Sequence, residues 1–427
     1  MRQLLFLSFV ILSLHAQAAE YTVDMLIEKA LVSSPDLNIS RDAFAFSKQQ
    51  TKQALSNYLP QIDLYGSAGY AGVKSVSTQE DGRLITGQIT ASQLIFDFGK
   101  TSGQIGFYSH ESNASFANYS QNISNKIYTV KQNYYDLLRR DSLIRVYEEN
   151  LKLTQQQLIR ARRYFEAGIK TKIDVADANV RLIEAELDLE NSRYDLKLGY
   201  VTLDRSIGNI HETVEGEVYL PDLNITSDLY GSLPKENMSL DALVDFAYSH
   251  RNTLKSYDHK IKSAQSKVRQ ESGDYFPGLY LGGDYQHSNT ETALQPYLPE
   301  EQWNANVNLK WNLFGGFRTM AKTEQAKIAL LQSRSTFDDA KLRIRQETGD
   351  ADINLRKSQA NVKLSQALSK AAKEKFEQAQ KRYENGLSDY IELQEARQGY
   401  INANAKLVSS YYNYFIALAA LDRAIGR

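Results

Sequence analysis

The 427-residue sequence contains no cysteine and only seven prolines. Without thiols the chain forms no disulfide, thiolate nucleophile, cysteine-ligated metal centre or cysteine-linked lipid anchor. The formal net charge of -1 lacks the basic excess that favours a nucleic-acid partner. Beyond the first 20 residues, no apolar run approaches the roughly 20 residues that a membrane-spanning helix needs. We therefore expect any contact of the mature chain with a lipid bilayer to be made by β-strands.

The first residues have the pattern of a secretory signal peptide. Arg2 gives a positive start, an apolar stretch follows it, and Ala16-Gln17-Ala18 matches a small-x-small cleavage site. We predict that residues 1–18 form this signal peptide and that the mature protein functions outside the cytoplasm.

The sequence also contains an internal duplication. When the chain is shifted by about 218 positions, LDRSIG (203–208) aligns with LDRAIG (421–426), and FEAG (165–168) aligns with YENG (383–386). A period of this length indicates two large copies of one unit rather than a solenoid of short repeats. We predict a first structural repeat over residues 19–209 and a second one over residues 241–427.

Each copy contains two segments with the alternation of a β-strand. In WNANVNLKWNLF (303–314), apolar residues occupy the odd positions and asparagine or lysine nearly all the even ones, so one face is apolar and the other polar. A less strict alternation predicts strands over residues 62–73, 84–96 and 279–288. A soluble sandwich produces the same pattern with its polar face in solvent, so the alternation alone does not choose between solvent and lipid.

Long segments without proline follow the strands. Apolar residues at three- and four-residue steps predict helices over residues 101–166 and 171–207, and again over 319–384 and 389–425. The longer helices would each measure about 100 Å at 1.5 Å per residue. The helix over 171–207 has two apolar seams, which indicates packing partners on both sides, as in a closed ring of helices. The seams consist of Val180, Ile183, Leu187, Tyr194 and Val201, and of Leu182, Leu189, Leu196 and Leu203.

Secretion, two-faced strands and very long helices together favour an oligomer at a membrane. Four strands cannot close a barrel, because a membrane barrel needs at least about eight strands and leaves no unpaired edge in lipid. Three copies would supply twelve strands. Trp303 and Trp311 would then lie about 26 Å apart at 3.3 Å per residue, a spacing that fits two aromatic girdles.

Two further motifs are doubled, the strand-to-helix turns IFDFGK (95–100) and LFGGFR (313–318) and the turns at Gly168 and Gly386. With the duplication, they resemble the TolC family of outer-membrane efflux proteins over essentially the whole mature chain. The resemblance implies a mainly α-helical homotrimeric duct, in which a twelve-stranded outer-membrane β-barrel continues as a long periplasmic α-helical barrel. It also implies a small equatorial domain containing residues 210–240.

The resemblance further implies a passive channel of a tripartite efflux or type I secretion system, which exports small molecules or polypeptides. Its expected partners are two copies of itself, a periplasmic adaptor protein, an inner-membrane pump of the RND, ABC or MFS type, and outer-membrane lipid. Neither a cofactor nor a metal nor a nucleic acid is expected. The adaptor would contact the tips at Gly168 and Gly386, whereas the cargo and the pump stay open.

The resemblance places a periplasmic gate in RYENGLSDYIELQEAR (382–397). Glu392 and Glu395 are three residues apart on one helix face, so a threefold axis would turn them into two acidic rings. In this resemblance Tyr383 takes the position of a gating tyrosine, Asp174 that of an acid on the other helix pair, and Ser388 replaces an arginine of the family pattern.

A structural interpretation of two of these acids competes with the gate. Thr171-x-x-Asp174 and Asp389-x-x-Glu392 both fit a capping box, in which a carboxylate accepts hydrogen bonds from backbone N–H groups at a helix start. The sequence leaves both interpretations open.

An enzyme is not expected. Phe98-Gly99-Lys100-Thr101 resembles the end of a phosphate-binding loop, but that loop needs glycine where the chain has Leu94, so a turn and a helix start explain it better. The six histidines include no HExxH pair, and no serine lies in a nucleophile elbow. The alternative from another class is a periplasmic or surface coiled-coil scaffold with a soluble β head.

Overall fold

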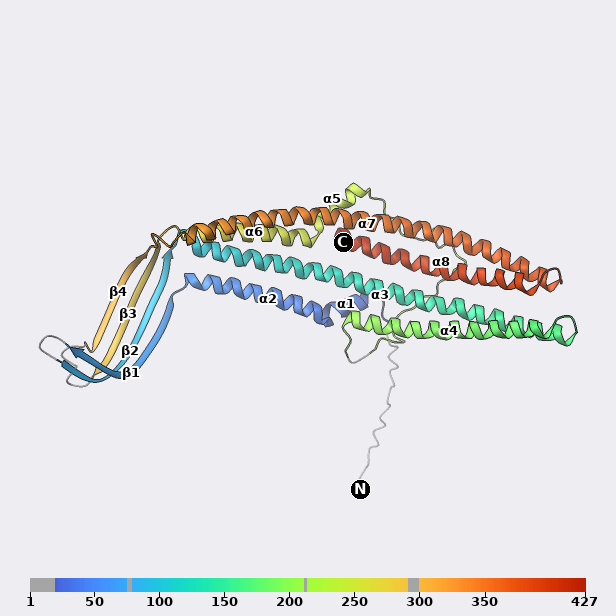
Figure 1. Cartoon of the computed structure of the whole chain (residues 1–427), viewed down its shortest axis with the longest axis horizontal. Coiled ribbons are helices and arrows are strands. Elements are labelled where there is room, and N and C mark those ends of the chain that lie inside the picture. The colour runs from blue at the N-terminus through green and yellow to red at the C-terminus, as the bar shows by residue number, and fades with distance from the viewer. Residues whose placement is uncertain (1–19, 75–78, 211–212, 291–298) are drawn as a thin grey trace, which may run out of the picture. The chain divides into compact units, whose positions relative to one another are not determined.

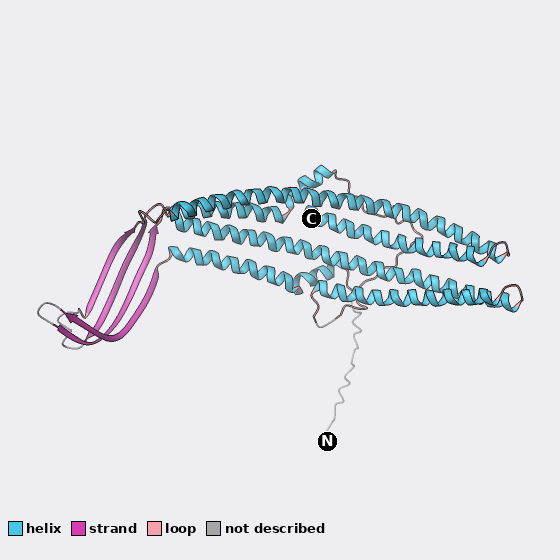
Figure 2. Cartoon of the chain, in the orientation of Figure 1, coloured by secondary structure: helices cyan, strands magenta, loops and turns pink. Residues whose placement is uncertain are grey.

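A computed structural model of the chain describes residues 20–74, 79–210, 213–290 and 299–427. Two similar series of elements follow one another (Figures 1 and 2). The first series contains α1 (Val23–Ser33), α2 (Pro35–Leu55), the 3-10 helix η1 (Ser56–Tyr58), β1 (Gln61–Lys74), β2 (Gln79–Phe96), α3 (Lys100–Glu166) and α4 (Lys172–Ile207). The second contains α5 (Leu240–His250), α6 (Asn252–Gly273), β3 (Gly278–Thr290), β4 (Glu301–Lys310), α7 (Arg318–Glu384) and α8 (Tyr390–Ile425).

The chain divides into two compact units, and both copies contribute to each of them. One unit contains the chain up to Pro35, Asn125–Met238 and Asp350–Arg423, and the other contains the sheet and the helix segments that adjoin it. The four long helices begin and end within two residues of their predicted bounds. Among the described residues, no helix combines the length and the hydropathy needed to cross a membrane.

The four strands form one antiparallel sheet in the order β1-β2-β3-β4 (Figure 1), in which the central pair joins the two copies. The expected strand over 303–314 is four residues too long. β4 ends at Lys310, which pairs with Gly278, the first residue of β3. Because β3 begins directly after Pro277, the residues after Lys310 have no partner strand.

A sharp turn connects β2 to α3. Asp97 caps the helix, because its Oδ2 atom accepts a hydrogen bond of 2.7 Å from the Thr101 backbone N–H. Phe98 and Gly99 have positive φ values of 52° and 96°. The interpretation of this segment as a turn and a helix start is thereby confirmed, and the equivalent turn before α7 repeats the positive φ at Phe317.

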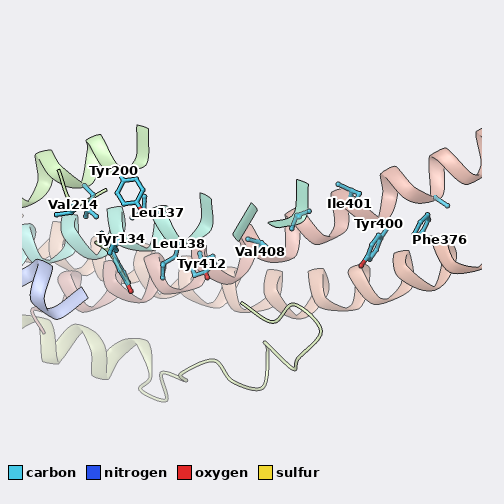
Figure 3. Close-up of a cluster of buried hydrophobic side chains, with 14 of the residues drawn as sticks. Tyr134, Leu137, Leu138, Tyr200, Val214, Phe376, Tyr400, Ile401, Val408 and Tyr412 are labelled. Carbon is cyan, nitrogen blue, oxygen red and sulfur yellow. The ribbon is translucent and has the colours of Figure 1, made fainter. Parts of the chain in front are cut away.

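The core of the first unit is apolar and aromatic. Leu26 of α1, Leu137 of α3 and Leu203 of α4 have no exposed surface, and Tyr400 and Tyr412 of α8 belong to the same cluster (Figure 3). The segment after α4 packs against this core in three ways: Val218 forms a parallel bridge with Tyr21, Tyr134 donates a hydrogen bond to the Tyr219 carbonyl at 3.1 Å, and the Tyr414 hydroxyl donates to the Pro234 carbonyl.

Candidate functional site: a two-faced sheet and a helical tip

The strand register sorts the side chains of the sheet onto two chemically different faces. Partner residues across all four strands form rows, and neighbouring rows point to opposite faces. One row is apolar and consists of Leu64, Ile89, Tyr285 and Trp303. The next row is more polar and consists of Tyr65, Gln88, Gln286 and Gln302.

The apolar face is uncovered within the chain. Leu64 is 77% exposed and Trp303 is 74% exposed. Contiguous exposed apolar surface of this kind marks a contact with another protein or with lipid. On the opposite face, Asn306 donates a hydrogen bond of 2.8 Å to the Asn304 side chain, and Asn304 donates to Asp284. The sheet therefore presents one apolar and one hydrogen-bonding surface, as its alternation predicts.

The two tryptophans lie in different surroundings. Trp303 belongs to β4, whereas Trp311 follows the strand, and its indole N–H donates to the Tyr275 carbonyl at 3.1 Å. The expectation that both tryptophans belong to one strand is therefore wrong, because β4 ends at Lys310, whereas their place in two aromatic girdles stays a prediction.

The helical tip consists of two turns with the same backbone structure, one in each copy. Gly168 and Gly386 both have φ of 71°, a value that favours glycine. The N–H groups of Ile169 and Leu387 each donate to the carbonyl five residues earlier, both at 2.8 Å. Such bonds close the C-terminus of a helix. The turns that connect α3 to α4 and α7 to α8 are therefore equivalent.

Asp174 completes a capping box at the start of α4. Its Oδ2 atom accepts hydrogen bonds from the Thr171 backbone N–H at 2.8 Å and from the Thr171 hydroxyl at 2.7 Å, while its own N–H donates to that hydroxyl. The hydrogen bond from the Thr171 hydroxyl is the main reason that the pKa of Asp174 lies below its ordinary value. The capping interpretation of Asp174 is thus confirmed.

The two acids of α8 differ in their contacts. The Glu392 N–H donates to the Asp389 side chain at 2.8 Å, so Asp389 caps the helix. The Glu392 carboxylate lies 3.4 Å from the Arg382 guanidinium. Glu395 is exposed and has no ion-pair partner within 4.0 Å among the described residues. Of the acids on this turn of α8, Glu395 is therefore the freer one.

Tyr383 lies in the interior of the tip. Its ring centre is 6.3 Å from that of Tyr164 on α3 and 6.1 Å from that of Tyr390 on α8, and the Lys170 ammonium lies 5.3 Å from its ring centre. Burial raises the pKa of Tyr383 and raises that of Tyr390 to about 12. The nearby Ser388 hydroxyl is buried and has no hydrogen-bond partner among the described residues. Tyr383 therefore packs between the two hairpins of its own chain.

A buried polar layer joins α3 to α8 beside these tyrosines. Arg397 is 3% exposed, and its guanidinium donates to the side-chain oxygens of Asn150 and, at 2.8 Å, Gln394. Gln394 donates in turn to Gln157 at 3.0 Å. Sequence reasoning missed this layer. Its signal is that Gln394 and Arg397 occupy positions of the buried, mainly apolar face of α8.

The two predicted seams of α4 lie on opposite sides of the helix. Leu189 and Leu203 are buried, and Leu182 and Leu196 pack against the same core. The other seam is 51 to 65% exposed at each position and consists of Val180, Ile183, Leu187, Tyr194 and Val201. On α7, Ile353, Leu364 and Leu368 are likewise exposed. This unit thus has two uncovered apolar helix edges.

Comparison with known proteins agrees with this architecture. A family model described as outer membrane efflux protein matches residues 26–209 and 243–427, once on each copy. The chain is 23% identical over 394 residues to the outer membrane protein TolC of Vibrio cholerae, covering 90% of this chain and 85% of that protein. It is 23% identical over 421 residues to the outer membrane efflux protein BepC of Brucella suis, covering 99% and 88%.

A solved structure has the same fold. A structure of CusC, whose description refers to transmembrane channel formation, superposes with a TM-score of 0.83 at 17% identity and covers 97% of this chain and 95% of that one. The duplicated long helices and the two-faced sheet therefore define an outer-membrane channel protein. The chain belongs to the outer membrane efflux protein family, and its location is the outer membrane.

Proposed function

We propose that three copies of this chain assemble into a passive duct through which cargo crosses the periplasm and the outer membrane. The observation that carries the proposal is the pair of uncovered apolar edges on α4 and α7. In a closed ring, the α4 edge of one copy packs on the α7 edge of the next copy, so no apolar helix edge stays exposed to solvent. The exposed seam of α4 lies opposite its buried seam, as a helix in a barrel wall requires.

The sheet supports the same assembly. β1 and β4 are its edge strands, and their unpaired backbone groups must be satisfied in lipid. Three sheets joined edge to edge give twelve strands. Trp303 then faces lipid on the apolar side, and Asn304 and Asn306 face the lumen. In the alternative scaffold the apolar face would be covered by protein, yet within the chain Trp303 is 74% exposed.

We propose the tip as the gate. Glu395, and Glu392 one turn away, form two acidic rings in the trimer, which attract cations and repel each other. The pairing of Glu392 with Arg382 at 3.4 Å supports a closed state that loses this ion pair on opening. Because Tyr383 is buried and Asp174 is used as a cap, we assign both to positioning the hairpins rather than to lining the pore.

The tips at Gly168 and Gly386 are our proposed contact for a periplasmic adaptor, which connects the duct to an inner-membrane pump of the RND, ABC or MFS type. Exposed apolar side chains beside both glycines, Ile169 at 65% and Leu387 at 70%, support this contact. The polar face of the sheet favours no single cargo, so small molecules and polypeptides are both candidates. The duct has no catalytic role in this proposal.

Conductance in planar bilayers tests the proposal. The purified protein is expected to form cation-preferring channels of low conductance, and Glu392→Ala with Glu395→Ala is expected to raise that conductance. Glu190→Ala, which removes an exposed acid of α4 far from the tip, serves as the control. Channels whose conductance and cation preference stay the same in the double variant would refute the gate, and a protein that forms no channel would refute the duct.

A further inference from the structure

The helices α3 and α6 pack closely against each other in the unit that contains the sheet. A Cβ atom at Gly103 of α3 would lie only 2.5 Å from the backbone nitrogen of Gln270 of α6, so the helix backbones nearly touch at this level. Further along the same contact, the Ser263 hydroxyl of α6 donates to the Phe107 carbonyl of α3 at 3.3 Å. The two helices run in opposite directions along this contact and leave little room between them.

Two histidines face each other one helical turn beyond this hydrogen bond. His110 of α3 and His259 of α6 have ring centres 6.1 Å apart, and their ring planes are inclined by 22°. The Nδ1 atom of each ring is buried and has no hydrogen-bond partner among the described residues. Buried polar atoms are nearly always paired with protein, water or ligand. Two unpaired nitrogens on facing rings therefore point to one group that both of them contact.

The distance between the rings fits a shared metal ion. A zinc–nitrogen bond to histidine measures about 2.0–2.1 Å, and the nitrogen lies about 1.1–1.2 Å from the centre of its ring. Two imidazoles on opposite sides of one ion therefore have ring centres at most about 6.4 Å apart. The observed 6.1 Å lies just within this limit, and the small angle between the ring planes is compatible with such an arrangement.

The surroundings favour neutral imidazoles. Burial is the main cause that lowers the pKa of His110, and the neighbouring His259 lowers it further. Of the charged neighbours, Asp258 and Lys262 of α6 pair with each other at 2.7 Å, so together they add no net charge. A neutral imidazole has the lone pair that binds a metal ion.

We propose that His110 and His259 bind one divalent transition-metal ion through their Nδ1 atoms, and that water completes its coordination. Imidazole nitrogen suits Zn²⁺, Cu²⁺ and Ni²⁺, of which Cu²⁺ binds most tightly to such ligands. The ion would connect α3 to α6 beside their closest approach. Because the two ligands come from different helices, a motif such as HExxH does not reveal the pair.

The site does not depend on the proposed duct. Both histidines belong to the same compact unit of a single chain, and no contact between copies takes part. If the chain formed no channel, the metal site would still stand, and loss of the metal site would leave the duct proposal unchanged.

Copper binding to the detergent-extracted full chain tests the site, with Cu²⁺ alone as the probe. The protein is purified without a histidine tag and freed of metal by a chelator, and pulsed electron paramagnetic resonance counts the imidazoles on the bound ion. We expect one saturable Cu²⁺ per chain, with two imidazoles bound to it. His110→Asn and His259→Asn should each weaken binding at least tenfold and leave at most one imidazole. His250→Asn, at an exposed position that ends α5, serves as the matched control and should change neither result.

Thermal unfolding gives a second measurement. An ion that binds only the folded chain stabilises it, so Cu²⁺ should raise the unfolding temperature of the original protein but not that of His110→Asn. Circular dichroism verifies that the variants fold, and the imidazole count on the original protein needs no variant. The inference is overturned if Cu²⁺ shows no saturable binding, which would assign the place between the rings to water. It is also overturned if the bound ion has fewer than two imidazoles, or if either folded variant keeps the affinity of the original protein.

Discussion

Two carboxylates placed on the exposed seam of α4 are expected to prevent assembly. Ile183→Asp with Leu187→Asp changes two of its five apolar side chains, which are 51 to 65% exposed in the isolated chain. Complete burial of such a side chain contributes about 1.5–3 kcal/mol, so covering its exposed part contributes about 1–2 kcal/mol and the whole seam about 5–9 kcal/mol. The variant loses about 2–4 kcal/mol of this and must also bury two unpaired carboxylates, at several kcal/mol each.

A closed trimer contains this contact three times, so both free energies count three times. At each contact, the lost apolar burial and the two buried carboxylates together cost more than the whole seam contributes. Light scattering in mild detergent measures the number of chains per particle, and we expect three for the original protein and one for the variant. Asn179→Asp places a carboxylate on an exposed position of α4 beside the seam and should leave the trimer intact. A double variant that is folded by circular dichroism and still trimeric would refute the assignment of this edge to the interface.

Three further predictions concern stability and lipid contact. Arg397→Met leaves the buried side-chain oxygens of Asn150 and Gln394 without a donor, which should lower the free energy of unfolding by about 2–6 kcal/mol, at about 1–3 kcal/mol for each oxygen. In a denaturant titration, the double variant Arg397→Met with Asn150→Leu should recover part of this loss. If it recovers none, the polar layer does not contribute to stability through these hydrogen bonds. The folded-state pKa of Asp174 lies below the ordinary 3.8, so the stabilisation from its cap is present above pH 3.8 and is lost as the pH falls through the folded-state value. Amide hydrogen exchange at the start of α4, corrected for intrinsic rates, should therefore become faster as the pH falls through that value. Asp174→Asn should remove this pH dependence. Brominated lipid should quench Trp303 more than Trp311 when each is the single tryptophan, and equal quenching would argue against the proposed lipid face.

The fold could be predicted largely from the sequence because its signals are periodic. The long helices lack proline and repeat apolar residues over dozens of positions, so their ends lie within two residues of the prediction. The end of β4 could not be predicted, because it depends on Pro277, which is distant in sequence and fixes where the partner strand begins. Alternation alone does not reveal where a partner strand stops.

The candidate site was less predictable. The capping box of Asp174 is a local motif and could be identified from the spacing of Thr171 and Asp174. The position of Tyr383 depends instead on Tyr164 and Tyr390, which belong to different helices, and no spacing along the chain brings these rings together.

The polar layer of Arg397, Asn150, Gln394 and Gln157 has a consequence for how the hairpins align lengthwise. When the contact between two helices consists of similar apolar residues, one helix can shift along the other by a turn or a heptad with little loss of packing energy. Helices of 67 residues allow many such lengthwise offsets. A slip of one turn, about 5.4 Å, would separate the guanidinium from its acceptors. With the hydrogen bonds from Tyr400 to Glu149 and between Ser142 and Tyr412, this layer therefore favours one lengthwise offset of α8 against α3 over the neighbouring ones.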